Sequence, residues 1–173
     1  MTKQELEWCI SEYGKDIYSF CKYLTGSLLE ADDLYQDTFL MAVELIEKID
    51  YKNNPKSYLL SIALRIWKNK KRKFAWRNRI AEMQPLVEEK DVDRGMFSEL
   101  TPEEFIICKE TEEMVRQAVA DLPDKLKPVV LLFYMEGLQV SQIAAVMKIP
   151  EGTVLSRLHH ARKVLYKKIG GRF

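Results

Sequence analysis

The feature that most constrains the fold of this chain is a pair of apolar stripes near its C-terminus, separated by a three-residue break. Both stripes have helical spacing, the first formed by Val140, Ile143, Ala144 and Met147 and the second by Val154, Leu158, Ala161 and Leu165. The break, Lys148-Ile149-Pro150, predicts a short turn, and the small Ala144 lets two helices approach closely. Residues 138–165 are therefore predicted to fold as a helix-turn-helix.

The second helix of this motif would leave a polar and basic face exposed. In a helix-turn-helix the second helix enters the major groove of DNA, where its first residues reach base edges and later cations lie near phosphates. We expect the DNA contacts to come from Ser141, Gln142, Glu151, Gly152, Thr153, Leu155, Ser156, Arg157, His159, His160, Arg162 and Lys163. The alternatives are an ordinary helical hairpin with a solvated basic face and, for the histidine pair, a pH sensor.

Helical periodicity extends over nearly all of the chain, and the sequence has no alternating, strand-like runs. The pattern predicts an early helix that stops at Gly26, a second from about Leu28 to Ile49, and a third that begins at Pro55. One further helix is expected to begin at Pro102 and to end before Pro123, and another is expected from Lys125 to Met135, ahead of Gly137. The predicted fold class is all-α, with two small helical domains joined by an acidic linker: residues 1–80, residues 105–173 and, between them, residues 81–104.

The formal net charge of +1 conceals four blocks of alternating sign. Residues 1–50 carry 4 basic and 11 acidic side chains, 51–80 carry 10 basic and none acidic, 81–121 carry 4 basic and 12 acidic, and 122–173 carry 9 basic and 3 acidic. Basic patches attract phosphate backbones by releasing counterions, whereas acidic segments repel DNA. The basic blocks therefore indicate nucleic-acid contacts, and the acidic blocks indicate a protein partner or a tether.

The first basic block ends in a helix that interleaves cations with aromatic rings. Between Arg65 and Arg79 the chain holds Trp67, Phe74 and Trp76 among many lysines and arginines. Single-stranded DNA binding uses this combination, because cations follow the backbone while rings stack on bases. The other interpretation is that Tyr58 and Trp67 are core residues and that the lysines form a solvated surface.

Outside these segments, the sequence offers no reaction chemistry. The stretch Asp32 to Asp37 is an acidic helix without a nearby base or metal-ligand set, so we interpret it as a protein-binding face. Cys9, Cys21 and Cys108 are widely spaced and are interpreted as reduced, half-buried thiols. Without a nucleophile and base, a glycine-rich phosphate loop or a metal cluster, we predict no catalytic residue, metal or cofactor, and no enzyme.

The sequence also lacks an apolar run of about 20 residues, the length needed to span a bilayer, and its first residues carry charges where a signal peptide would be apolar. We therefore expect a soluble, cytoplasmic protein without direct membrane insertion.

Three motifs occur in order along the chain: Asp32-Asp33-Leu34-Tyr35-Gln36-Asp37-Thr38-Phe39, then Tyr58-Leu59-Leu60-Ser61-Ile62-Ala63, then Ile149-Pro150-Glu151-Gly152-Thr153-Val154-Leu155-Ser156-Arg157-Leu158. Together they resemble bacterial extracytoplasmic-function (ECF) sigma factors of the sigma-70 family, over almost the full length. The resemblance implies a sigma-2-type and a sigma-4-type domain. It also implies that the protein binds core RNA polymerase and directs promoter recognition, DNA melting and transcription initiation.

The resemblance further implies roles for particular residues. Docking on the β′ clamp helices of polymerase would use Asp32, Asp33, Tyr35, Gln36 and Asp37. Capture of a flipped minus-ten base and holding of separated strands would use Tyr51, Lys52, Asn53, Asn54, Ser57, Arg65, Trp67, Lys68, Lys70, Lys71 and Arg72. The helix-turn-helix set above would read the minus-thirty-five element.

Other expected contacts also follow from the resemblance. The acidic linker would thread toward the active-site channel of polymerase, the β subunit would be a second polymerase contact, and an anti-sigma factor would mask the polymerase-binding faces. Arg65, Leu155 and His160 depart from the family's usual residues, which bears on the promoter sequence; Leu155 suits a thymine methyl group. A stand-alone dimeric regulator is the main rival, but it would leave Asp32–Asp37 and the aromatic basic helix unexplained.

Overall fold

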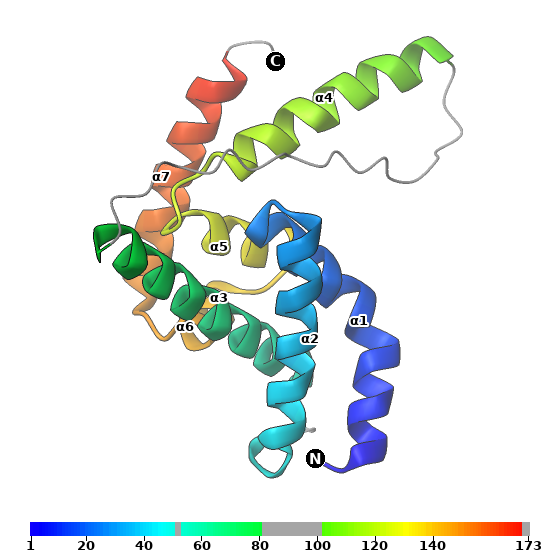
Figure 1. Ribbon diagram of the computed structural model, residues 1–173. Coiled ribbons are helices and arrows are strands. Elements are labelled where there is room, and N and C mark those ends of the chain that lie inside the picture. The colour runs from blue at the N-terminus through cyan, green and yellow to red at the C-terminus, as the bar shows by residue number, and fades with distance from the viewer. Residues whose placement is uncertain (51–52, 81–101, 171–173) are drawn as a thin grey trace.

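The computed structural model describes residues 1–50, 53–80 and 102–170, and the side chains of all of these except residues 102–110. Within these ranges the chain is helical and contains no strand, which confirms the all-α prediction. The elements are α1 (Lys3–Thr25), α2 (Leu28–Glu44), the 3₁₀ turn η1 (Ile46–Lys48), α3 (Pro55–Ile80), α4 (Pro102–Ala120), α5 (Lys127–Val130), the π-helical turn η2 (Leu131–Met135), α6 (Val140–Met147) and α7 (Glu151–Ile169) (Figure 1). Residues 81–101 of the predicted linker lie outside the described residues.

Local sequence signals set several helix ends. Thr2 and Glu5 form a capping box at the start of α1, and Gly26 closes that helix with φ 74°, a conformation that costs glycine little. The predicted extension of the second helix to Ile49 is wrong, because α2 ends at Glu44 and the chain tightens into η1. This tighter turn brings Ile49 into the core, where only 2% of it is exposed.

The first three helices form the N-terminal part of the molecule. In Figure 1, α1 and α2 lie side by side and α3 crosses them. Each helix contributes an apolar stripe that packs against the other two. The largest fully buried side chains of this part are Ile17, Phe20, Leu24, Leu34, Ile49, Leu59, Leu60 and Leu64.

The C-terminal part contains the predicted helix-turn-helix, formed by α6 and α7. Within the second stripe, Val154, Leu158 and Ala161 are buried and Leu165 is partly buried, so the stripe faces the core as predicted. Lys148 ends α6 with φ 54°, and Gln142 Oε1 accepts a hydrogen bond from Gln139 N at 2.9 Å to cap the start of that helix.

The two parts share one apolar core. Residues of η2 and the helix-turn-helix, including Leu132, Ile143 and Met147, belong to the same buried cluster as residues of α1 and α3. The helix α6 packs on α3, and η2 packs on α1. The domains predicted from sequence are therefore held against each other in this structure.

Two of the three cysteines are buried more deeply than expected. Cys9 and Cys21 are both 0% exposed instead of half-buried, while the side chain of Cys108 is outside the described part. Burial is the main cause that raises the pKa of Cys21, to about 12. The reactive thiolate is therefore scarce at neutral pH.

We expect iodoacetamide to leave Cys9 and Cys21 unmodified in the native protein and to modify both in urea, because unfolding removes the burial that raises their pKa values. Peptide mass mapping after a timed reaction measures this. Equal modification of Cys21 in native buffer and in urea would contradict the prediction.

Candidate nucleic-acid interface

The outward face of α7 is the most exposed of the predicted contact surfaces. Because Val154, Leu158 and Ala161 are fixed in the core, the rotation of the helix is set and the opposite face points to solvent. Exposed on α7 are Glu151, Gly152, Leu155, Ser156, His159, His160, Arg162 and Lys163, whereas Thr153 and Arg157 are half-buried. The structure thus presents the residues predicted on this helix as one continuous surface.

One cation of this surface is held by the scaffold behind it. Arg162 Nε donates to the Tyr134 hydroxyl at 2.8 Å, and its guanidinium lies 6.0 Å from the centre of the Phe133 ring. These contacts reduce the freedom of a side chain that remains exposed. Arg162 is therefore preorganised on the face that would meet a phosphate backbone.

The two residues predicted on α6 have different surroundings. Ser141 is exposed, but Gln142 is half-buried, caps its own helix and faces α3 instead of the α7 surface. In this arrangement Gln142 therefore serves the helix end and the contact between the two parts of the molecule.

The C-terminal half of α3 forms a second basic surface. Lys70, Lys71 and Arg72 are exposed, and the rings of Phe74 and Trp76 are 62% and 65% exposed. Trp67, in contrast, is 4% exposed and belongs to the core, which is the interpretation that the sequence left open. Phe74 and Trp76 are therefore the rings available for stacking; the sequence placed both in the aromatic basic helix, but of the three rings only Trp67 was assigned to the minus-ten set.

Buried Trp67 still touches the basic surface. Lys71 Nζ lies 5.8 Å from the centre of the indole ring, and no described group pairs with the indole N–H. Arg65 is exposed and Lys68 is half-buried on the same helix, while Arg72 donates a hydrogen bond to Asn69. The basic face is thus anchored through Trp67 to the helical core.

The start of α3 contains a small polar hollow of about 260 Å³. Asn53 and Asn54 are exposed at its edge, Ser57 lines it, and Tyr51 and Lys52 are outside the described residues. Asn54 has φ 50° and its Oδ1 accepts from Ser57 N at 3.1 Å, which caps α3. The Ser57 hydroxyl is buried and has no described hydrogen-bond partner. The hollow therefore offers a free polar group of the kind that a base edge needs.

The predicted protein-binding face of α2 is acidic and ordered. Asp32, Asp33 and Gln36 are exposed, and Asp32 Oδ1 accepts from the Tyr18 hydroxyl at 2.8 Å. Tyr35 is half-buried and its ring meets those of Tyr18 and Phe39 edge-on. Burial is the main reason that its pKa is raised, so the phenol stays neutral.

Asp37 joins the acidic face to the basic one. Its Oδ2 lies 2.7 Å from Lys70 Nζ, and both side chains are almost half exposed. The predicted polymerase-docking and strand-holding residues, which are far apart in the sequence, therefore meet at a common edge of α2 and α3.

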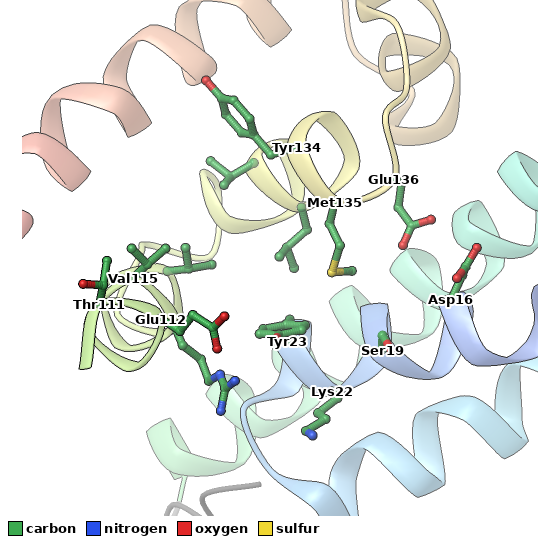
Figure 2. A pocket seen from close by; sticks show the side chains of 14 residues that line it. Asp16, Ser19, Lys22, Tyr23, Thr111, Glu112, Val115, Tyr134, Met135 and Glu136 are labelled. Atoms are coloured by element: carbon green, nitrogen blue, oxygen red, sulfur yellow. The ribbon is translucent and has the colours of Figure 1, made fainter. Parts of the chain in front are cut away.

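The sequence did not reveal a cluster between the two parts of the molecule. Lys56 at the start of α3 bridges Asp16 of α1 and Glu136, which directly follows η2. Asp16 and Glu136 lie at the edge of a groove of about 1050 Å³ between α1, α4 and η2 (Figure 2). The only available signal was that Glu136 is one of 3 acidic residues in a basic block.

The described residues contain neither a metal-binding cluster nor a membrane-spanning helix. No cluster of three or more His, Cys, Asp or Glu side chains in this part of the chain is placed to hold a metal ion. None of the described helices is both long and apolar enough to cross a membrane.

Comparison with known proteins identifies the two parts of the molecule. The family model of Sigma-70 region 2 matches residues 9–77, and that of Sigma-70, region 4 matches residues 112–165. The ECF RNA polymerase sigma-E factor of Haemophilus influenzae is 31% identical over 141 residues, which cover 79% of this chain and 73% of the relative. The chain belongs to the ECF RNA polymerase sigma factor family. The resemblance inferred from the three motifs is thereby confirmed.

Other relatives agree with this assignment. The ECF RNA polymerase sigma factor SigW of Bacillus subtilis is 27% identical over 166 residues, covering 91% of this sigma factor and 84% of SigW. As a member of the family, the protein is a transcription initiation factor that acts with RNA polymerase on promoter DNA.

Solved structures share the arrangement of helices. The sigma factor RpoE of Bartonella quintana, in complex with the anti-sigma factor NepR, has a TM-score of 0.77 at 20% identity, covering 99% of this sigma factor and 98% of RpoE. CnrH, in complex with the cytosolic domain of CnrY, has a TM-score of 0.67 at 15% identity, covering 99% and 92%. At these identities the likeness concerns the fold.

Proposed function

We propose that this sigma factor divides its work between a sigma-2-type domain, residues 1–80, and a sigma-4-type domain, residues 105–173, joined by an acidic linker, residues 81–104. The first domain docks on polymerase, captures a minus-ten base and holds separated strands, and the second reads the minus-thirty-five element. The observation that supports this division best is the presence of two separate basic faces, on α3 and α7, with an acidic face beside the first.

The acidic face of α2 is proposed to bind the β′ clamp helices. Asp32, Asp33, Gln36 and Asp37 present carboxylate and amide groups at its surface, and the packed rings of Tyr18, Tyr35 and Phe39 stiffen the helix behind them. Such a face suits basic side chains of a partner protein and repels DNA. The β subunit is proposed as a further contact of the sigma factor.

The start and the exposed half of α3 are proposed to act on the minus-ten element. The hollow at Asn53, Asn54 and Ser57 would receive a base turned out of the stack, while Lys70, Lys71 and Arg72 follow the backbone. Phe74 and Trp76 are proposed to stack on the bases, because Trp67 is buried.

The face of α7 is proposed to lie in the major groove at the minus-thirty-five element. Leu155 and Ser156, near the N-terminus of the helix, reach base edges, and Arg162 and Lys163 lie near phosphates. The N-terminal end of a helix also favours phosphate through its free N–H groups.

Regulation is proposed to involve an anti-sigma factor, since RpoE and CnrH, which share the fold, were each solved with a protein partner, an anti-sigma factor in the case of RpoE. Because the proposed role is binding and strand separation next to polymerase, we assign the chain no catalytic reaction of its own. Its place of action is that of polymerase, the cytoplasm.

A reconstituted transcription reaction tests the proposal. Purified protein is added to core RNA polymerase and a library of candidate promoter fragments, and run-off transcripts are sequenced. The proposal expects transcripts that start downstream of a shared pair of elements and that depend on the added chain. Sequence-specific DNA binding without association with polymerase would instead support the stand-alone regulator.

Asp37→Ala is expected to weaken polymerase binding about tenfold, which corresponds to roughly 1.4 kcal/mol for a charged contact at an interface. Stability should stay within about 0.5 kcal/mol of the parent, because the ion pair with Lys70 is almost half exposed. Binding is measured by fluorescence anisotropy with core polymerase, and stability by urea unfolding.

Glu44→Ala is the matched control for Asp37→Ala, because it removes an exposed carboxylate from the same helix outside the proposed face. Equal loss of polymerase affinity in both variants would show that only the net charge matters. Unchanged affinity in Asp37→Ala would remove that residue from the docking face.

A further inference from the structure

The two proposed DNA-binding parts cover each other in this structure. The wall of α3 that carries Tyr58, Ser61 and Arg65 faces Val146 and Lys148 at the C-terminal end of α6. The polar hollow at Asn53 to Ser57 is likewise closed on one side by α6. The part of the minus-ten surface at the start of α3 therefore borders the helix-turn-helix, whereas Lys70, Lys71 and Arg72 remain exposed.

The two basic faces also approach each other. The pKa of Lys68 on α3 is lowered by burial and, in addition, by the positive charge of Arg157 on α7. Both residues are half-buried, and the charge of Arg157 disfavours the charged form of Lys68. The shared apolar core and a polar contact hold the two parts together against this repulsion.

Promoter geometry requires a different arrangement. The minus-ten and minus-thirty-five elements are about 25 base pairs apart, or roughly 85 Å at the 3.4 Å rise of DNA. While α6 packs on α3, the surfaces of α3 and α7 cannot reach both elements at once. If the proposed function is correct, the domains must separate before both elements are bound.

The Lys56 cluster is a polar contact between the two domains within the described residues. Lys56 Nζ lies 2.6 Å from Asp16 Oδ2 and 2.9 Å from Glu136 Oε2. The side chain of Glu136 is 2% exposed and that of Lys56 is 21% exposed. Figure 2 shows the carboxyl groups of Asp16 and Glu136 close to each other where the segment after η2 passes α1. Lys56 also lies 6.0 Å from the centre of the Tyr13 ring.

The closed arrangement leaves the Glu136 carboxylate dependent on Lys56. Burial raises the pKa of Glu136, and the positive charge of Lys56 opposes this. Removing Lys56 would leave a buried carboxylate with Asp16 as a neighbouring like charge, whereas separation of the domains would return that carboxylate to water. Loss of Lys56 therefore destabilises the closed state selectively.

We propose that Lys56, Asp16 and Glu136 form an interdomain latch that holds the sigma-4-type domain over the part of the minus-ten surface at the start of α3. Opening the latch moves α6 away and exposes the α3 wall together with Asn53, Asn54 and Ser57. This inference rests on the proposed function for its consequence at promoters, but the latch itself is a property of the free protein.

Energy transfer between two dyes measures opening without polymerase or DNA. Cysteines are introduced at Leu40 on α2 and Tyr166 on α7, which are 64% and 75% exposed, in a chain with Cys108→Ser; Cys9 and Cys21 stay because they are buried. Lys56→Met is expected to raise the ratio of open to closed molecules about tenfold or more. Glu136→Gln, which keeps the shape and removes the buried charge, should shift the ratio less.

Two further variants separate the latch from general damage. Lys15→Met removes an exposed cation from α1 beside Asp16 and should leave the distances unchanged. The exchange Lys56→Glu with Glu136→Lys again places one cation next to two carboxylates, so it should close the molecule that Lys56→Glu alone opens. Circular dichroism checks that each variant remains helical.

The consequence is measured with a single-stranded minus-ten oligonucleotide, which open variants should bind about tenfold more tightly, in proportion to the open fraction. The latch would be overturned if the dye-to-dye distance in Lys56→Met equalled that of the parent protein. It would also be overturned if the double variant Lys56→Glu with Glu136→Lys stayed open. Opening without a gain in oligonucleotide affinity would overturn its covering role. If the dye distances change as expected but run-off transcription fails, the proposed function is wrong and the latch still stands.

Discussion

Trp67→Ala should lower the free energy of unfolding by about 3–5 kcal/mol, the range for truncating a large buried aromatic residue. The indole is 4% exposed and packs in the core that α3 shares with the other helices. Its truncation leaves a cavity that a long, straight helix cannot easily fill. Urea unfolding followed by circular dichroism measures the loss.

Trp76→Ala is the matched comparison, since it removes the same side chain from the same helix at a position that is 65% exposed. Stability should remain within about 0.5 kcal/mol. Affinity for single-stranded minus-ten DNA should fall about 5- to 100-fold if the ring stacks on one base, because such stacking contributes about 1–3 kcal/mol. A variant that binds like the parent would exclude Trp76 from the strand-holding surface.

Leu158→Ala should lower stability by about 2–5 kcal/mol, and minus-thirty-five binding should be lost with the fold of α7. The side chain is 2% exposed and fixes the rotation of the helix against its neighbours. Thermal unfolding and gel-shift binding with a duplex minus-thirty-five site are the measurements.

Leu155→Ala makes the same truncation three residues earlier on α7, where the leucine is 55% exposed. It should leave stability within about 0.5 kcal/mol and weaken binding to the cognate duplex by about 1 kcal/mol, with little effect on unrelated DNA. If Leu155→Ala destabilised the protein as much as Leu158→Ala, the rotation assigned to α7 would be incorrect.

These pairs also show how far the sequence determines the site. The helix-turn-helix was predictable because the stripe of Val154, Leu158 and Ala161 repeats on one face and the turn between the helices contains proline. Because that stripe faces the core, the remaining residues of α7 were predicted to be exposed. Of the residues predicted on α7, only Thr153 and Arg157 are half-buried, which depends on neighbours that periodicity does not reveal.

The sequence alone could not determine which aromatic residues of α3 are buried and which are exposed. Trp67 follows Leu60, Ala63 and Leu64 at helical spacing, so its burial agrees with the stripe. Phe74 lies seven residues further on and is also in register, yet it is 62% exposed. The difference arises because the described core covers α3 only as far as Trp67 and leaves residues 69–80 exposed.

Local sequence patterns could not predict the end of α2 or the Lys56 cluster, and the reasons differ. Apolar residues continue through Leu45, Ile46 and Ile49, so periodicity extended the helix, but the core needed the tighter turn of η1 to receive Ile49. Lys56 and Glu136 come from separate parts of the chain, and their pairing depends on how those parts pack. Charge counts identified Glu136 as unusual without indicating its partner.

The apolar core that runs from α1 and α3 into η2, α6 and α7 has a consequence for the apparent affinity for promoters. A partner that binds only separated domains can bind only the open fraction of the protein. Its apparent dissociation constant is therefore the intrinsic constant divided by that fraction. Substitutions that loosen Ile143 or Met147 from the shared core would therefore be expected to raise the apparent affinity for promoter DNA without changing any residue proposed to touch polymerase or DNA.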